Sequence, residues 1–283
     1  MRVRLNARGL AIKVDRVRIA AGKRQMPALV LSPREPAVNA PGMLWVHGGG
    51  YVTGMKEMVF MARAVDLVER FGAVVVSPGY RLSWQAPYPA ALDDCWAALL
   101  WLRDHASELG VNDAQLMVGG ESAGGGLAAA LALRARDTGE VRLAYQMPLY
   151  PMIDNLDTVS SRRNRAKVWN TRRNHAAWRL YLRQDARSKN VEAYAAAARA
   201  RDLSGLPPLY TFVSTAEPFY AETLAYVLRL RSAGVKAEVD VYEGLYHAFD
   251  MLEPDRDESI IARERFCAQF AWAAEHCFAP QGE

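Results

Sequence analysis

The 283-residue sequence contains little cysteine. Its three cysteines, Cys95, Cys267 and Cys277, are widely separated along the chain, too few and too scattered for a disulfide framework or a structural zinc site. This scarcity excludes a disulfide-stabilised secreted scaffold. It favours a reducing compartment, so we expect a cytoplasmic protein.

The sequence also lacks long apolar runs. No stretch of about 18 apolar residues occurs, and no apolar signal-peptide core follows the arginines of the segment Met1 to Arg8. Because 51% of the residues are hydrophobic, the chain can still bury a large core, which excludes a disordered or collagen-like protein. We therefore expect a soluble protein that does not associate with a membrane.

Lysine is scarce, since only 6 of the 35 basic residues are lysine and the rest are arginine. A formal net charge of +4 on a chain of this size produces only a weak electrostatic field and does not indicate a nucleic-acid partner. The charge is nevertheless uneven. Residues 154–201 contain twelve basic and four acidic side chains, a net charge of +8, which leaves −4 on the remainder.

Short apolar runs alternate with longer segments of helical periodicity. Two strands joined through Gly22 have the turn chemistry of a hairpin. The expected strands are 14–19, 26–31, 43–46, 73–77, 115–118, 144–149, 209–213 and 238–242, and the expected helices lie near 57–70, 90–109, 123–136, 219–232 and 258–276. This α/β alternation predicts a mostly parallel sheet covered by helices on both faces, with the hairpin at one edge.

One interval breaks the alternation. The residues between the strands 144–149 and 209–213 are too many for a single crossover helix. Their middle, 174–182, has a helical pattern. We expect one domain, residues 1–283, in which residues 154–206 form a small helical cap over one end of the sheet.

The stretch Gly120-Glu121-Ser122-Ala123-Gly124 is a G-x-S-x-G sequence between an expected strand and an expected helix. Small flanking residues permit a sharp turn that exposes the serine, and the helix N-terminus then directs its positive end at the serine oxygen. This context favours a nucleophile over an exposed serine that only caps the helix. A phosphate-binding loop is excluded, because no lysine follows the glycines and this is not the first strand–helix turn.

A glycine triplet, Gly48 to Gly50, follows His47 at the end of the strand 43–46. Such a loop leaves backbone N–H groups free to stabilise an oxyanion, which acyl transfer requires. Its position after a buried strand and upstream of the serine turn favours this role over a flexible surface loop.

Five histidines are candidates for the general base. His47 belongs to the glycine loop, His105 and His276 lie on expected amphipathic helices, and His175 lies in the insertion. His247 alone follows a late strand in a loop, from which it can reach the carboxyl end of the sheet. We assign it as the base.

The acid should lie between Ser122 and His247 in the order Ser, acid, His. The carboxylates in that interval include Asp154, Asp157, Asp185, Asp202, Glu217, Glu222 and Asp240. Glu217 follows the strand 209–213 and precedes Pro218, which places it at the same end of the sheet as the serine. A helix-capping carboxylate is the alternative role for Glu217, but we favour the catalytic one.

Taken together, the motifs resemble the hormone-sensitive-lipase-like family of α/β-hydrolase esterases over residues 15–275. The resemblance rests on these stretches as well as on the serine motif: His47-Gly48-Gly49-Gly50, Tyr80-Arg81-Leu82, Tyr88-Pro89-Ala90-Ala91-Leu92-Asp93-Asp94, Asp202-Leu203-Ser204-Gly205-Leu206-Pro207-Pro208 and Tyr246-His247-Ala248-Phe249. It implies the α/β-hydrolase fold and a serine carboxylesterase that hydrolyses small-molecule esters of short acyl chains without a metal or a cofactor.

The resemblance also implies an oxyanion hole formed by the amides of Gly49, Gly50 and Ala123. Where relatives have Asp-Pro after the seventh strand, this chain has Glu217-Pro218, which is one methylene longer. Tyr51 and Trp84 are candidates for the substrate pocket, although large aromatic residues are more often part of the core. Arg81 is expected to support a loop rather than to contact substrate.

Two other functions remain open on the same residues, an amidase or formamidase with the same triad and a catalytically silent ligand receptor. The segment before the first strand is short for this family, which implies a small cap. The acyl pocket is then either more open or completed by a second subunit in a homo-oligomer. The charge of the cap indicates a solvated face or ion pairs to the body, and we add the hypothesis that it favours esters bearing a negative charge.

Overall fold

The computed structural model describes residues 6, 7 and 9–282, so the expectation for the segment Met1 to Arg8 lies almost wholly outside the described residues. The strands are β1 (Ile12–Ala21), β2 (Arg24–Pro33), β3 (Ala40–Val46), β4 (Val74–Pro78), β5 (Val111–Glu121), β6 (Tyr145–Leu149), β7 (Leu209–Ser214) and β8 (Ala237–Tyr242). They form one sheet in the order β1-β2-β4-β3-β5-β6-β7-β8. The β1–β2 and β2–β4 pairs are antiparallel, and the other pairs are parallel.

The hairpin β1–β2 occupies one edge of the sheet, as the sequence predicts. Gly22 lies in its turn with φ 61°, a conformation that glycine adopts without a Cβ penalty. The strands β4, β6 and β7 are buried along their whole length, as expected for strands covered by helices on each face, whereas β8 at the far edge is only partly buried.

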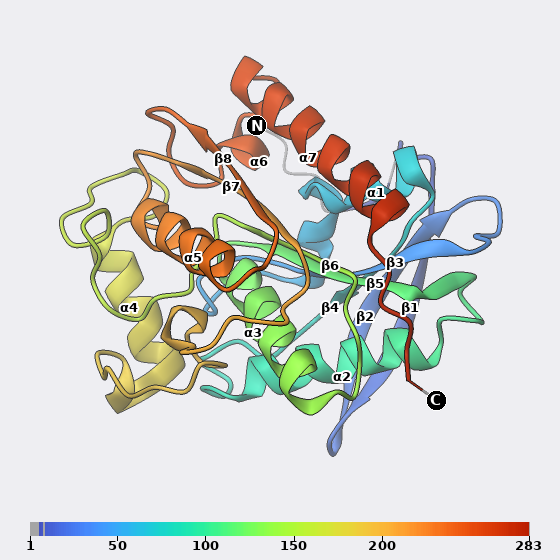
Figure 1. The fold of residues 1–283 in the computed structure, drawn as a ribbon, viewed down its shortest axis with the longest axis horizontal. Coiled ribbons are helices and arrows are strands. Elements are labelled where there is room, and N and C mark those ends of the chain that lie inside the picture. The colour runs from blue at the N-terminus through green and yellow to red at the C-terminus, as the bar shows by residue number, and fades with distance from the viewer. Residues whose placement is uncertain (1–5, 8, 283) are drawn as a thin grey trace.

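Helices cover both faces of the sheet (Figure 1). One face packs against α1 (Ala64–Phe71) and α7 (Asp257–His276), with the short α6 (Phe249–Leu252) beside α7. The other packs against α2 (Ala90–Asp104), α3 (Ala123–Thr138) and α5 (Tyr220–Ser232). Each layer contributes to its own cluster of buried apolar residues, and the expected mostly parallel α/β architecture is confirmed.

The segment between β6 and β7 contains α4 (Thr171–Leu182) and the 3-10 turns η2 (Arg183–Asp185) and η3 (Ala197–Arg199). Residues 154–206 are called the insertion below. Trp178 and Tyr181 of α4 are buried in the same cluster as Tyr51 and α3. The ring of Tyr181 stacks on Tyr51 with centroids 4.0 Å apart, so the insertion is packed onto the sheet layer.

Candidate active site

Ser122 lies at the turn between β5 and α3, which begins at the next residue. Its backbone has φ 57° and ψ −118°, a conformation that costs a non-glycine residue about 1–3 kcal/mol and recurs at functional turns. A Cβ on Gly120 or Gly124 would lie 2.3 or 2.0 Å from the carbonyl oxygen of Val46. Only glycine at these positions lets the turn close against the end of β3.

The three residues predicted as nucleophile, base and acid meet at the carboxyl ends of the strands. The hydroxyl Oγ of Ser122 lies 2.9 Å from Nε2 of His247, and Nδ1 of His247 faces Oε2 of Glu217. The other carboxylate oxygen of Glu217 accepts a hydrogen bond of 2.8 Å from the amide of Ser214 at the end of β7. All three side chains are buried, so the histidine is oriented by a fixed carboxylate.

Glu222, the other carboxylate near the start of α5, has a different environment. Its Oε1 accepts hydrogen bonds from the amides of Ile153 (2.9 Å) and Asp154 (3.1 Å), where the chain leaves β6 for the insertion. Burial, together with the nearby carboxylate of Asp154, raises the pKa of Glu222 well above its ordinary value. The extra methylene of Glu217 therefore does not displace the acid position to Glu222.

The remaining carboxylates considered as the acid are engaged elsewhere. Asp154 pairs with Arg199, Asp157 with His175, and Asp240 with Arg265. Asp202 accepts a hydrogen bond from the amide of Ser204, and Asp185 is exposed on η2.

The glycine loop after β3 has a turned backbone. Gly49 and Gly50 have φ values of 114° and 62°, and the carbonyl of Gly49 accepts the amides of Val52 and Thr53, each at 3.0 Å. Among the hydrogen bonds of the described residues, none has the amide of Gly49, Gly50 or Ala123 as donor. Ala123 is the first residue of α3, whose amide has no acceptor within the helix.

His47 orders this loop in its neutral form. Burial lowers the pKa of His47 to about 4, so Nδ1–H can donate to the carbonyl of Gly48 at 2.8 Å. The ring stacks on Tyr80 with centroids 4.2 Å apart, and the Tyr80 hydroxyl donates to the carbonyl of His47 at 2.9 Å. The other histidines, His105, His175 and His276, bond to Trp101, Asp157 and Trp272, respectively.

Aromatic rings that the sequence did not single out surround His247. Tyr150 and Phe219 contact its ring edge to face with centroids 5.0 Å away, and Trp169 of the insertion lies at 6.3 Å. A Cβ on Gly50 would lie 2.2 Å from the Trp169 ring, so this indole also covers the glycine loop. Tyr150 directly follows β6, a position that does indicate the site, whereas no local pattern marks Trp169.

A buried polar network lies behind Tyr150. Its hydroxyl donates to Oδ1 of Asp250 at 3.0 Å, and Arg63 faces the other oxygen of Asp250 at 3.5 Å. Glu121, next to Ser122 in the chain, accepts the indole N–H of Trp45 at 2.8 Å. Burial raises the pKa of Glu121 to about 8 and also raises the pKa of Asp250. The hydrogen bond to Asp250 holds the Tyr150 ring, which packs against the imidazole of His247.

Tyr51 and Trp84, the predicted pocket residues, lie in contrasting environments. Tyr51 is 2% exposed, and its hydroxyl donates to the carbonyl of Met152 at 2.7 Å. Trp84 is 62% exposed on the loop before α2. Neither has a hydrogen bond or ring contact to Ser122, Glu217 or His247 in the structure, and their contact with substrate stays a prediction. Arg81 pairs with Asp94, a contact that agrees with a structural role, and its expected lack of contact with substrate stays a prediction.

Within the described part of the chain, no three His, Cys, Asp or Glu side chains are arranged to hold a metal ion. None of its helices has the length and apolar character needed to cross a bilayer. The site therefore offers one activated hydroxyl, one oriented imidazole and a set of free backbone amides. This combination on this fold defines a serine hydrolase.

The sequence pattern of the α/β-hydrolase fold family matches residues 43–251, and the chain belongs to that family. It is 34% identical over 217 residues to the esterase LipI of Mycobacterium tuberculosis, covering 75% of this chain and 66%, about two thirds, of that protein. It is 32% identical over 234 residues to the carboxylesterase NlhH of the same species, covering 81% and 72%.

A solved structure, the esterase LipW of Mycobacterium marinum, superposes with a TM-score of 0.85 at 30% identity, covering 94% of this chain and 83% of that one. The resemblance to the hormone-sensitive-lipase-like esterases is thereby confirmed.

Proposed function

We propose that the protein is a serine carboxylesterase that acts through an acyl-enzyme on Ser122. His247 takes the hydroxyl proton as Oγ attacks the ester carbonyl, and it then protonates the leaving alcohol. A water molecule then attacks the acyl-enzyme, again with His247 as the base and then the acid, and releases the carboxylic acid and free Ser122. Glu217 holds Nδ1–H of the imidazole and stabilises the imidazolium that forms.

One observation carries this proposal: the continuous contact from Ser122 through His247 to Glu217, beside amides that have no acceptor of their own. The amides of Gly49, Gly50 and Ala123 would stabilise the oxyanion, a contribution in which each donor is worth about 10²–10³ in rate. The esterase names of the relatives support ester over amide hydrolysis.

The acyl half of the substrate is proposed to be short. Trp169 lies on the glycine loop and Phe219 on the imidazole, which leaves bulky rings close to the reacting centre. Residues 154–206 would serve as the cap within a single domain, completed by a second subunit if the protein is a homo-oligomer. The three cysteines are free and buried, which supports function in the reducing cytoplasm.

The test is hydrolysis of p-nitrophenyl acetate and butyrate by the purified protein and by the Ser122→Ala variant. We expect the variant to lose on the order of 10⁴-fold or more in kcat, because the nucleophile is gone while the fold remains. Absence of nitrophenol release by the unmodified protein, or equal rates for both proteins, would show that the esterase assignment is wrong.

A further inference from the structure

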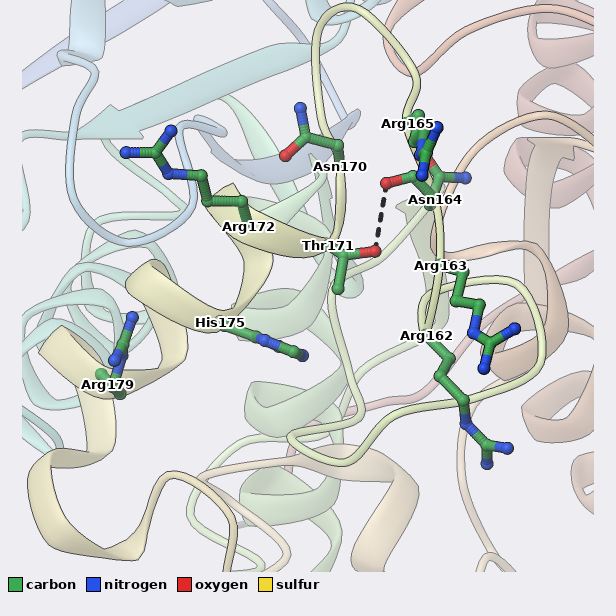
Figure 2. A pocket seen from close by; sticks show the side chains of 9 residues that line it. All are labelled: Arg162, Arg163, Asn164, Arg165, Asn170, Thr171, Arg172, His175 and Arg179. Atoms are coloured by element: carbon green, nitrogen blue, oxygen red, sulfur yellow. Dashed lines mark hydrogen bonds between the residues drawn. The ribbon is translucent and has the colours of Figure 1, made fainter.

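The insertion contains an open pocket of about 630 Å³ on the side of α4. It lies between the segment 162–165 and the first turns of α4, and Figure 2 shows Arg172 and Arg179 on the helix and the other arginines on the segment before it. We call it the arginine pocket, after Arg162, Arg163, Arg165, Arg172 and Arg179. All five side chains line one open concavity, and their guanidinium groups are exposed and spread around its rim (Figure 2).

These five guanidinium groups form no hydrogen bond or ion pair with any described residue. Most other described arginines have a partner; Arg24 and Arg81, for instance, both pair with Asp94. Asp157, the acidic residue that contacts His175 of the pocket, is also paired with Arg187. The positive charge of the pocket is therefore not neutralised by the protein itself.

The dipole of α4 adds to the positive electrostatic potential of the arginine pocket. α4 has twelve residues and begins at Thr171, which lines the pocket. The amides of Thr171 and Arg173 already have acceptors, Asn164 O and Asn170 Oδ1. The helix therefore contributes mainly the positive end of its dipole rather than a set of free donors.

Hydrogen bonds hold the walls in place. The hydroxyl of Thr171 donates to the carbonyls of Ser161 (2.6 Å) and Asn164 (3.1 Å), the second of which is drawn in Figure 2. The side-chain amide of Asn164 in turn donates to the carbonyl of Ala216 at 3.0 Å. The segment that carries three of the arginines is thus anchored both to α4 and to the loop that holds Glu217.

A single carboxylate would leave most of the five guanidinium groups unpaired. Guanidinium binds phosphate oxygens in a bidentate geometry, and a volume of this size is typical of small-ligand sites. A long nucleic acid fits poorly, because the chain outside residues 154–201 has a net charge of −4 and would repel it. We propose that the arginine pocket binds the diphosphate or triphosphate group of a small molecule.

The pocket lies beside the candidate active site. Asn170 of the pocket directly follows Trp169, whose ring covers Gly50 and lies near His247. The phosphate group can therefore belong to the ester substrate itself or to a separate small molecule. Binding of a phosphate group to the arginine pocket does not require ester hydrolysis. Only the alternative in which the phosphate group belongs to the ester substrate rests on the proposed function.

The experiment is calorimetric titration of the full chain carrying Ser122→Ala with inorganic pyrophosphate at constant ionic strength. We expect binding of one pyrophosphate per chain. The double variant Arg163→Gln/Arg172→Gln, with one change on each wall, should bind about 10–100-fold more weakly, because two charge-assisted contacts are lost. The control Arg18→Gln/Arg201→Gln removes the same charge from two exposed arginines outside the pocket, and its affinity should stay within about twofold.

Three outcomes would overturn the proposal: no binding at millimolar pyrophosphate, equal weakening in both double variants, or an oligonucleotide that binds more tightly than pyrophosphate. Loss of esterase activity in the parent protein, by contrast, would leave this binding result standing and count only against the proposed function.

Two further measurements on the chain with Ser122 intact distinguish a phosphate group that belongs to the ester substrate from one that belongs to a separate small molecule. If the phosphate belongs to the substrate, pyrophosphate inhibits hydrolysis of a diphosphate-bearing ester competitively, and Arg163→Gln/Arg172→Gln raises KM for that ester but not for p-nitrophenyl acetate. If it belongs to a separate molecule, a diphosphate group bound in the arginine pocket does not place the ester for hydrolysis, so pyrophosphate does not inhibit competitively and Arg163→Gln/Arg172→Gln leaves KM for the diphosphate-bearing ester unchanged.

Discussion

Glu217 and Glu222 are buried carboxylates five residues apart that contact different groups. We expect Glu217→Gln to lower kcat by about 10²–10⁴, because a neutral amide stabilises the imidazolium poorly and permits the wrong tautomer. Glu222→Gln should change kcat by less than about threefold. Burial raises the pKa of this carboxyl well above its ordinary value, which favours its neutral form, and glutamine retains the oxygen that accepts the amides of Ile153 and Asp154.

Steady-state hydrolysis of p-nitrophenyl acetate by both variants measures this difference, with circular dichroism as a control for folding. Equal losses, or a larger loss in the Glu222 variant, would contradict the assignment of Glu217 as the acid.

Glu121 imposes a pH dependence on stability. Its pKa is about 8 in the folded protein, against an ordinary value of 4.5 for an exposed glutamate, so the unfolded chain loses its proton first as the pH rises. This residue therefore lowers the free energy of unfolding between pH 4.5 and pH 8, by up to roughly 5 kcal/mol. Glu121→Gln keeps an acceptor for Trp45 and removes the titration.

Urea unfolding at pH 5 and pH 8 tests this prediction. The variant should be about as stable as the unmodified protein at pH 5 and more stable at pH 8. A stability difference that does not change with pH would contradict it.

Individual residues could be predicted from the sequence where a motif marks them. The serine turn, the glycine loop and the histidine after β8 are defined by neighbours along the chain, and the structure brings Ser122 and His247 within hydrogen-bond distance. Trp169 could not be found in this way. Its position against Gly50 depends on how the insertion packs over the sheet, which no periodic pattern in residues 154–170 encodes.

At the scale of elements, the contact between the insertion and the glycine loop is the most sensitive to substitution. Gly50→Ala would place a Cβ 2.2 Å from the Trp169 ring at a φ of 62°, so either the ring or the loop must move. We expect kcat/KM to fall by about 10²–10³, as for the loss of an oxyanion donor.

The double variant Gly50→Ala/Trp169→Ala relieves the collision but not the left-handed backbone of the alanine, which costs about 1–2 kcal/mol. It should recover part of the lost activity relative to Gly50→Ala, with Trp169→Ala alone as the matched control. No recovery would indicate that backbone strain, rather than the indole, accounts for the whole effect.

The boundaries of the helices show where the local sequence pattern is not enough to predict the structure. The strands and the hairpin agree with the sequence because their apolar runs are buried. The segment expected as one helix near 57–70 is instead η1 (Lys56–Met61) followed by α1, with Ala62 in an extended conformation. Arg63 at this break faces Asp250 from a distant part of the chain, and such a tertiary contact leaves no trace in helical periodicity.

The whole molecule is expected to unfold as one cooperative unit. Trp178, Tyr181 and Leu203 of the insertion belong to the same buried cluster as Tyr51 and Leu127 of the sheet layer, so the insertion cannot separate without exposing apolar surface. Urea midpoints from tryptophan fluorescence, far-ultraviolet circular dichroism and esterase activity should coincide. An earlier midpoint for activity and fluorescence would show that the insertion unfolds independently.

The groups around Ser122 come from the loop after β3, the insertion, the end of β7 and the loop after β8. During synthesis from the N-terminus, the nucleophile turn emerges more than a hundred residues before its base, and the indole over Gly50 emerges between them. A growing chain that has not yet reached His247 holds a hydroxyl with no proton acceptor beside it. Hydrolytic competence therefore arrives only once His247 has emerged, after the strands that surround the serine have had time to pair.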